Sequence, residues 1–466
     1  MDETTGAPSG PGDAADAATT QGLARRALAW DAAALPAEAR RIAVHCIVDW
    51  YAVTLAGAAD PAVRVLLDDA LAEGGNPVAT AAGSPRRLGM YGAALVNGTA
   101  AHLLDYDDVN LAITGHPTAV VYSALLPLAE SLRAGGAELL SAFVAGYETA
   151  CRVGRWLGDA HYERGYHATA TVGAVAAAAA CARLLRLDAG RAAAALSLAA
   201  TQAGGLKAMF GTMGKPLHAG LAARNGLTAA CLAARGFDGG GAALEAPQGY
   251  AAVLSPAPDA AACRAGAPRG LYLYDRLFKY HAACYGTHAG IECARDIARN
   301  ARFLPEEVDA IHVAAHASAR KMCSIPAPAT PNEARFSMAL NVAFGLLGLD
   351  TADAAAYTPG RLADPRVVAL RDKVAVDYVE DVAMMESAVE LRLRNGTVLR
   401  ARRDAGVAEP DVGREESRLR AKFTALAGPV LGAQRAAGLL ESLFALPSCA
   451  DASALARPLA AAGAPA

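Results

Sequence analysis

Between residues 118 and 235 one apolar, small-residue helical run follows another, and this succession constrains the fold more than any other feature of the chain. The runs cover residues 118–134, 139–157, 166–187, 188–203 and 221–235. Alanine is the best helix former, and helices with so few polar positions are buried on most sides. Small side chains let such helices pack closely, so we expect one large all-helical domain.

The helical pattern begins well before this block. Pro36 opens one of its helices, because proline is favoured at the first helical position. Residues 1–20, in contrast, are mostly Gly, Pro, Asp, Ala and Thr, and we expect them to form a disordered tail. We therefore predict that residues 21–265 form the first part of the helical domain. Its upstream helices are expected within residues 23–55, 62–72 and 88–104.

The composition and the hydrophobic pattern of the sequence change near residue 237. Residues 237–275 are rich in Gly, Pro and Ala and are typical of a hinge or a long loop. Residues 308–314 then alternate like a strand, and residues 382–403 indicate two strands joined at Asn395-Gly396, a strong hairpin signal. Two helices are expected in the same region, at residues 284–299 and 334–347.

These elements predict a second, α+β domain over residues 270–404. Residues 415–445 are helical once more, so residues 405–460 are expected to return to the first domain. The predicted fold is therefore mainly α, with a large helical domain built from the N- and C-terminal parts of the chain and a smaller α+β domain.

Composition excludes several classes of function. A net charge of -3 gives no basic field for nucleic acid or for a membrane surface. No apolar run has the length and hydropathy of a membrane span, and no basic segment followed by an apolar one marks a secretion signal. The nine cysteines include no C-x-x-C pair, which argues against a zinc or iron–sulfur site and for reduced thiols in a cytoplasmic protein.

The stretch that most suggests chemistry is HLLDYDDVNLAITGHP, residues 102–117. Asp105, Asp107 and Asp108 crowd into four positions, and close carboxylates raise one another's pKa and are costly to bury unpaired. They either face water or serve a site. His116 precedes a proline, which places it at an element boundary where a side chain can project into a cleft. A solvated acidic loop between two helices is the alternative.

Two further histidines have distinctive contexts. His167 stands at a predicted helix start, where the macrodipole disfavours the imidazolium and favours a neutral ring that can act as a base. His288 follows Thr287 near the start of another expected helix. Each histidine, taken alone, fits equally well as a satisfied core or capping residue. No set of histidines and cysteines has the spacing of a familiar zinc site, so we expect no metal.

Two lysine-containing segments also stand out. Lys215 lies in GTMGKPLHAG, which lacks the spacing and the preceding strand of a phosphate loop. Its place between Gly and Pro in an apolar region suits a point-charge partner for a carboxylate, and a surface lysine on a turn fits as well. Lys279, His281 and Cys284 cluster in FKYHAACYGTH. Cys284 is either a reactive cysteine or a small buried thiol. A reactive cysteine needs a lowered thiol pKa, and a buried structural thiol does not.

Four segments in order resemble the signature segments of the MmgE/PrpD family. They are HLLDYDDVN with the following GHP, YHATATVGA, GTMGKPLHAGLAARNG and KYHAACYGTH. That family includes 2-methylcitrate dehydratase, cis-aconitate decarboxylase and iminodisuccinate epimerase. The resemblance covers nearly the whole chain after the tail. It implies a large helical domain, a smaller α+β lid domain, a homodimer, no cofactor, and an active site in the cleft between the domains.

The resemblance also assigns site residues. Its catalytic positions fall on Asp105, His116, His167 and Lys215. In its lid segment the family positions fall on Lys279, Cys284 and His288, and these three, with His281 of the same segment, are the candidate substrate-binding residues. The chain departs from the family at two points. Val109 stands where dehydratases and decarboxylases of the family have Thr. The second is in EARFSMAL, residues 333–340, which ends in Leu340 and lacks the tyrosine that the family often has after this segment. Apolar groups there would leave oxygens of a tricarboxylate unpaired, so we expect a substrate other than methylcitrate or cis-aconitate.

These observations lead to a functional hypothesis. The chain is expected to be a cofactor-free lyase, a dehydratase or decarboxylase, acting on a small polycarboxylate. His116 would be the principal acid/base with His167 as its partner or as a substrate contact, Lys215 and Lys279 would hold carboxylates, and Asp105 would orient a neighbour or act as a second acid. An epimerase or isomerase using the same site for proton exchange is the runner-up, and a catalytically inactive binding or scaffold protein is the third alternative.

Overall fold

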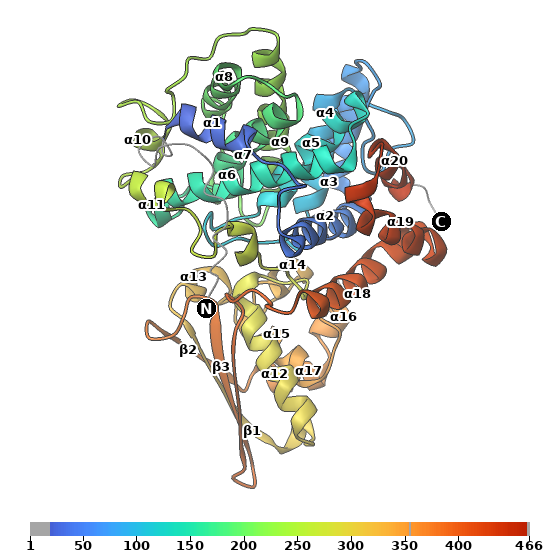
Figure 1. Cartoon of the computed structure of the whole chain (residues 1–466). Helices are drawn as coiled ribbons and strands as arrows, with labels where there is room; N and C mark the ends of the chain where they lie inside the picture. The colour runs from blue at the N-terminus through green and yellow to red at the C-terminus, as the bar shows by residue number, and fades with distance from the viewer. Residues whose placement is uncertain (1–18, 354–355, 464–466) are drawn as a thin grey trace, which may run out of the picture. The chain divides into compact units, whose positions relative to one another are not determined.

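The computed structural model of the chain describes residues 19–353 and 356–463. It confirms the predicted fold class, because the described chain is mainly helical and carries a small four-stranded sheet (Figure 1). The chain divides into two compact units: one runs to Arg276 and resumes at Pro410, and the other is Leu277–Glu409. Up to residue 18, the expected N-terminal tail lies outside the described residues, and Thr19 caps the first helix by accepting the N–H of Gly22.

The first unit consists of helices. Its α-helices are α1 (Thr20–Leu28), α2 (Ala37–Gly57), α3 (Pro61–Glu73), α4 (Met90–His102), α5 (Pro117–Leu132), α6 (Gly136–Glu163), α7 (Ala168–Leu184), α8 (Ala189–Ala200), α9 (Gly214–Ala234), α10 (Tyr250–Leu254), α11 (Ala260–Ala265), α18 (Val412–Leu431), α19 (Ala433–Phe444) and α20 (Ser453–Ala456). Short 3₁₀ helices join some of them: η2 (Lys207–Met209), η3 (Tyr272–Asp275), η7 (Leu446–Ser448) and η8 (Arg457–Gly463).

Most of these helices match the predicted ones, with ends that differ by a few residues. Two regions differ more. Helix α9 begins at Gly214, well before the expected residue 221, so Lys215 lies in its first turn. Residues 237–275, expected to be loop, contain α10, α11 and η3.

The alanine-rich helix α7 lies at the centre of the first unit. Nearly all of its residues are buried, and it packs against α5, α6, α8 and α9. Glycines permit the closest approaches: a Cβ on Gly226 of α9 would lie 2.6 Å from the carbonyl oxygen of Ala174 in α7. The small residues of the sequence therefore bring these backbones into contact, as the helix pattern predicts.

The C-terminal helices of this unit pack against its N-terminal part. In Figure 1 the red α18 lies alongside the blue α2, and the two helices are in contact. Glu415 of α18 makes two buried contacts with the N-terminal part: it lies 2.8 Å from Nδ1 of His45 in α2 and forms an ion pair with Arg276, 2.7 Å from Nη2. A buried charge is tolerated only with such partners, so these contacts fix the position of α18 on α2.

The second unit is an α+β structure. Its strands are β1 (Val308–His316), β2 (Val374–Val379), β3 (Glu386–Leu393) and β4 (Val398–Asp404). Its helices are η4 (Tyr285–Thr287), α12 (His288–Asn300), η5 (Pro305–Glu307), α13 (Ala319–Met322), α14 (Pro331–Ala334), α15 (Met338–Leu346), α16 (Pro359–Leu362) and α17 (Pro365–Arg371). The sheet order is β2-β1-β3-β4, with β1 and β2 parallel and the other pairs antiparallel.

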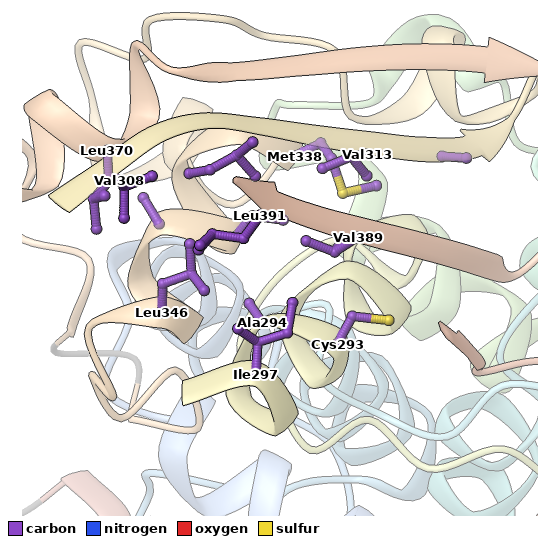
Figure 2. Close-up of a cluster of buried hydrophobic side chains, with 14 of the residues drawn as sticks. Cys293, Ala294, Ile297, Val308, Val313, Met338, Leu346, Leu370, Val389 and Leu391 are labelled. Atoms are coloured by element: carbon purple, nitrogen blue, oxygen red, sulfur yellow. The ribbon is translucent and has the colours of Figure 1, made fainter. Parts of the chain in front are cut away.

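The predicted hairpin is present and the parallel strand β2 was not predicted. Strands β3 and β4 pair with Leu391 opposite Leu399, and Gly396 supplies the positive φ of 89° that the turn requires. Helices α12 and α15 cover the sheet and bury one common apolar layer with it. Figure 2 shows Ile297 of α12, Leu346 of α15 and Leu391 of β3 in this layer.

Within the described ranges, no one helix is both long and apolar enough to cross a bilayer. Helices α2 and α3 meet that test only as a pair, and they are bent by 89° at the break between them.

Candidate active site

The acidic stretch forms a loop that joins α4 to α5. Helix α4 ends at His102, and Asp105 then takes a positive φ of 50°, which aspartate tolerates better than most residues. A bridge between Asn110 and Gly115 closes the loop, with the N–H of Asn110 donating to the carbonyl oxygen of Gly115 at 3.0 Å. Pro117 occupies the first helical position of α5 and leaves His116 as its N-cap.

Close helix packing holds this loop against α7 and α9. A Cβ on Gly98 of α4 would lie 2.8 Å from the Cα of Gly220 in α9, so the two helices touch through glycines. A Cβ on Gly115 would lie 2.8 Å from Oγ1 of Thr169 in α7, and the same Oγ1 accepts the N–H of His116 at 3.2 Å. The loop, the start of α7 and the start of α9 therefore meet in one place.

Asp107 lies between two histidines. Its Oδ2 is 2.9 Å from Nδ1 of His102 and 3.1 Å from Nδ1 of His116, although the second contact is out of line for a hydrogen bond. Burial acts to raise the pKa of Asp107, but the two rings more than offset it and hold that pKa well below its usual value. Burial lowers the pKa of His102 to about 4, against the opposing effect of Asp107. The neutral His102 thus donates its Nδ1–H to an ionised Asp107.

Asp105 has a different partner. The ammonium of Lys215, in the first turn of α9, lies 2.6 Å from Oδ1 of Asp105. Nε2 of His116 is 3.6 Å from the same oxygen. The side chains of Asp105, Lys215 and His116 keep 21%, 14% and 11% exposure. In this cluster these three groups retain access to solvent, whereas His102 and Asp107 are buried.

Asp108, the third acid of the stretch, lies in a different environment from Asp105 and Asp107. It accepts the hydroxyl of Thr118 at 2.8 Å, and burial with the neighbouring Asp49 raises its pKa well above the usual value, which favours the uncharged acid. Burial also raises the pKa of Asp49 to about 6, although Lys422 of α18 opposes this. Lys422 lies 2.6 Å from Asp49 and donates to the carbonyl oxygen of Tyr106 at 2.7 Å. Helix α18 thus supports the acidic loop from its buried side.

His167 is the N-cap of α7, at the helix start that the sequence predicts. Its pKa is held well below the usual value, first by burial and then by His102, Lys215 and His218. The direction matches the sequence argument, but burial rather than the helix terminus is the main cause. The His167 ring stacks on His102 with centroids 5.5 Å apart and meets the edge of Phe210 at 5.1 Å.

The first unit thus brings together Asp105, His116, His167 and Lys215, the four expected catalytic residues. Sequence reasoning did not single out two members of this group. His102 stood unremarked at the end of an apolar helix, and Asp107 was one of three similar acids. The sequence held one indication of this pair: His102 and Asp107 lie five positions apart across the end of a helix. That spacing allows the two side chains to touch but does not require it.

The four expected substrate-binding residues lie in the second unit. Lys279, His281, Cys284 and His288 are all buried there. His281 contacts Oγ1 of Thr351 at 2.7 Å through Nδ1, and Nε2 of His288 lies 3.2 Å from the carbonyl oxygen of Ala283. Cys284 belongs to the apolar core of this unit. Their proposed contact with substrate stays a prediction.

Four side chains of the cluster could also hold a metal ion. His102, Asp105, Asp107 and His116 each offer one atom, and these atoms lie within 4.8 Å of one another. Imidazole and carboxylate together suit transition metals. The ammonium of Lys215 already pairs with Asp105, one of the four candidate ligands. A metal-free site therefore stays a prediction, which removal of metal by a chelator tests.

Comparison with known proteins gives concordant matches. The MmgE/PrpD N-terminal domain matches residues 21–262, and the MmgE/PrpD C-terminal domain matches residues 281–445. A cis-aconitate decarboxylase-like protein, oryM, of Aspergillus oryzae is 32% identical over 287 residues, 57% of this chain and 58% of the relative. Cis-aconitate decarboxylase of Homo sapiens is 27% identical over 377 residues, 78% of each chain. That of Mus musculus is 26% identical over 392 residues, 79% of this chain and 78% of the relative.

Proposed function

The chain belongs to the MmgE/PrpD family, and from this membership and the cluster around His116 we propose that it is a lyase, a dehydratase or decarboxylase, acting on a small polycarboxylate. Relatives named cis-aconitate decarboxylase support the reaction class. In this proposal the chain needs no cofactor, because acid/base and ion-pairing groups are enough for the chemistry.

The observation that carries the proposal is the position of His116 between two carboxylates. Asp107 faces Nδ1 at 3.1 Å, and Asp105 faces Nε2 at 3.6 Å. A carboxylate close to Nδ1 stabilises the positive charge that an imidazole acquires on taking a proton. Nε2 lies on the partly exposed side, beside Lys215, and is the nitrogen that we assign to proton transfer with substrate.

The two lyase reactions use this nitrogen in different directions. In a dehydration, Nε2 takes a proton from the carbon next to a carboxylate, and the electron pair forms the carbon–carbon double bond as the carbon–oxygen bond breaks. The hydroxyl group leaves as water with the proton that the His116 imidazolium returns to it. In a decarboxylation, the electrons of the breaking carbon–carbon bond remain on that carbon, CO₂ leaves, and the His116 imidazolium delivers a proton to the carbon. Negative charge develops next to a carboxylate in both cases, and an ammonium stabilises it.

Lys215 is our candidate for that ammonium. In the structure it pairs with Asp105 at 2.6 Å. A substrate carboxylate of the same geometry would share or replace this pairing. Lys279 of the second unit is proposed to hold another carboxylate, on the strength of the family resemblance.

The substrate itself is proposed to differ from cis-aconitate. Val109 is 6% exposed and gives an apolar side chain where the family's decarboxylases and dehydratases have Thr. The loss of a hydrogen-bonding partner leaves an oxygen of such a substrate unpaired, at a cost of about 1–3 kcal/mol. A dicarboxylate suits such a site better than methylcitrate or cis-aconitate does.

Proton NMR of the purified chain with a panel of di- and tricarboxylates in D₂O, cis-aconitate included, tests the proposal. New olefinic signals or loss of a carboxylate identify a lyase and its substrate. Deuterium exchange with formation of a stereoisomer, without alkene or CO₂, makes the protein an epimerase instead. Silence across the panel, with identical ligand binding by wild type and His116→Ala, would favour a non-catalytic binding protein.

A further inference from the structure

His218 contacts His167 and has no part in the proposed proton transfers. Its Nδ1 lies 3.1 Å from Nδ1 of His167. The ring sits on α9 three residues after Lys215, on the same face of the helix, so one helix start delivers both side chains to the cluster. Ring centroids of the two histidines are 5.4 Å apart, with their planes tilted by 50°.

The backbone at Gly205 approaches both histidines closely. The carbonyl oxygen of Gly205 accepts the N–H of His167 at 3.0 Å. Gly205 has a φ of 146°, a conformation that favours glycine, and a Cβ there would lie 3.0 Å from Cβ of Ala170 and 3.4 Å from both Cβ of His167 and Cγ of His218. The glycine therefore lets this backbone segment approach the two histidines closely.

A contact between two Nδ1 atoms requires one ring to carry a proton on Nδ1 and the other to offer a lone pair there. His167 is buried, whereas His218 is half-buried and lines a cavity of about 290 Å³ together with Gln202 and Asn225. Burial lowers the pKa of both rings, and that of His167 falls well below its usual value. Both rings are therefore neutral near pH 7, and one of them donates its Nδ1–H to the other.

We propose that His218 is a positioning residue: it donates its Nδ1–H to Nδ1 of His167 and so holds His167 as a neutral ring with its proton on Nε2. This inference rests on the proposed function for its purpose. A carboxylate offers only acceptors, so a neutral histidine can bind it only through an N–H. With Nδ1 engaged by His218, the Nε2–H of His167 is the donor that remains for a substrate carboxylate.

The roles of the two site histidines then separate. His116, beside Asp107, exchanges protons with the substrate carbon. His167 stays neutral throughout and holds a carboxylate oxygen, and no proton passes along the His218–His167 contact. A neutral donor suits a buried position because it adds no charge to desolvate.

Nitrogen NMR of the ligand-free protein tests the tautomer directly. The full chain is labelled with ¹⁵N-histidine, and the signals of His167 are assigned by their loss in His167→Gln. We expect a pyridine-type Nδ1 and a pyrrole-type Nε2 for His167. His218→Leu should mix the two tautomers, with a shift of about tenfold in their ratio, the worth of one neutral hydrogen bond. His218→Asn, whose amide replaces Nδ1, should restore the wild-type pattern.

Kinetics test the consequence for substrate. If only one tautomer binds, a smaller competent fraction raises KM in proportion and leaves kcat nearly unchanged. A tenfold shift in the ratio, from about 10:1 to about 1:1, lowers the competent fraction about twofold, so we expect His218→Leu to raise KM about twofold. His218→Asn should recover most of this change, and the cavity-lining Gln202→Ala should match wild type. Because His218 acts through His167, adding His218→Leu to His167→Gln should change KM no further.

A pyrrole-type Nδ1 on His167 in the wild type would overturn the inference, and so would full additivity of the two substitutions. The NMR measurement needs no substrate, so it decides the tautomer even if the polycarboxylate panel is silent. A confirmed tautomer with a silent panel would refute the proposed function alone. An active enzyme with the opposite tautomer would refute this inference alone.

Discussion

Oδ2 of Asp107 lies 3.1 Å from Nδ1 of His116, at the boundary between the buried and the partly exposed parts of the cluster. Asp107 is ionised and buried, and its other close partner, His102, is neutral. Among the described residues, no ammonium or guanidinium is recorded against the same carboxylate oxygens, so the negative charge of Asp107 faces His116. This relationship makes His116 the group whose removal should matter most.

His116→Gln should lower kcat by about 10²–10⁴, the usual contribution of a general acid/base. The matched control is His312→Gln, because His312 lies exposed on β1 and takes no part in the proposed site. The readout is the initial rate on the substrate found by the NMR panel. Unchanged kcat in His116→Gln would remove His116 from the mechanism.

Asp107→Asn should lower kcat by on the order of 10²-fold, since it leaves the ring geometry in place and removes the charge that stabilises the imidazolium. Asp309→Asn serves as control, because Asp309 forms an exposed ion pair with Arg392. Steady-state rates across pH measure the effect. A wild-type rate for Asp107→Asn would show that the contact with His116 is structural.

The crossing of α4 and α9 depends on the absence of a side chain at Gly220. A Cβ there would collide with the carbonyl oxygen of Leu95, so Gly220→Ala should destabilise the fold by about 1–3 kcal/mol or more. Gly438 lies exposed within α19 with open space around it, and Gly438→Ala should stabilise by about 0.5–1 kcal/mol. Urea unfolding of both variants makes the comparison, and equal midpoints would contradict it.

Glu148 provides a test of pH-dependent stability. Burial raises its pKa to about 7, although the N–H groups of Leu273 and Tyr272 donate to it at 2.9 and 3.2 Å. The folded state therefore holds a proton that the unfolded chain releases near its ordinary value of about 4.3. Between these two values the folded state binds more protons, so wild-type stability must fall as pH rises.

Glu148→Gln cannot titrate, so it isolates this effect. Relative to the variant, the wild type should lose on the order of 3 kcal/mol of unfolding free energy between pH about 4 and 7. Chemical denaturation of both proteins at several pH values measures the difference. A difference that is constant with pH would show that Glu148 titrates normally in the fold.

Removal of metal should leave the enzyme active. We expect an unchanged kcat after dialysis against a chelator, because Lys215 already supplies the positive charge at Asp105. Metal content is measured by elemental analysis on the same sample. If chelation abolishes activity and a divalent ion restores it, then His102, Asp105, Asp107 and His116 hold that ion.

Local sequence patterns predicted much of the fold and less of the site. The alanine-rich helices and the Asn395-Gly396 hairpin follow from periodicity and turn chemistry, which act over a few residues. Strand β2 was not predicted, because its partner β1 lies about sixty residues earlier in the sequence. Two parallel strands are not joined by a tight turn, so no turn residues mark the pairing. The start of α9 was placed too late because the glycines of its preceding segment obscure the helix.

The site shows the same division. Position before a proline or at a helix start marked His116 and His167, and both are N-caps. What the sequence could not supply was which acid faces which base. The pairings of Asp105 with Lys215 and of His167 with His218 join residues 110 and 51 positions apart, and depend on helix packing that no local pattern encodes.

The contact between Lys422 and the carbonyl oxygen of Tyr106 spans 316 residues of sequence. During synthesis, the acidic loop leaves the ribosome long before α18 exists. Until that helix arrives, Asp49 lacks its ammonium partner and the loop lacks its buried anchor. The order of translation therefore delays completion of the site until α18 has been made, so nascent chains that end before α18 should carry the helical core without a working cluster.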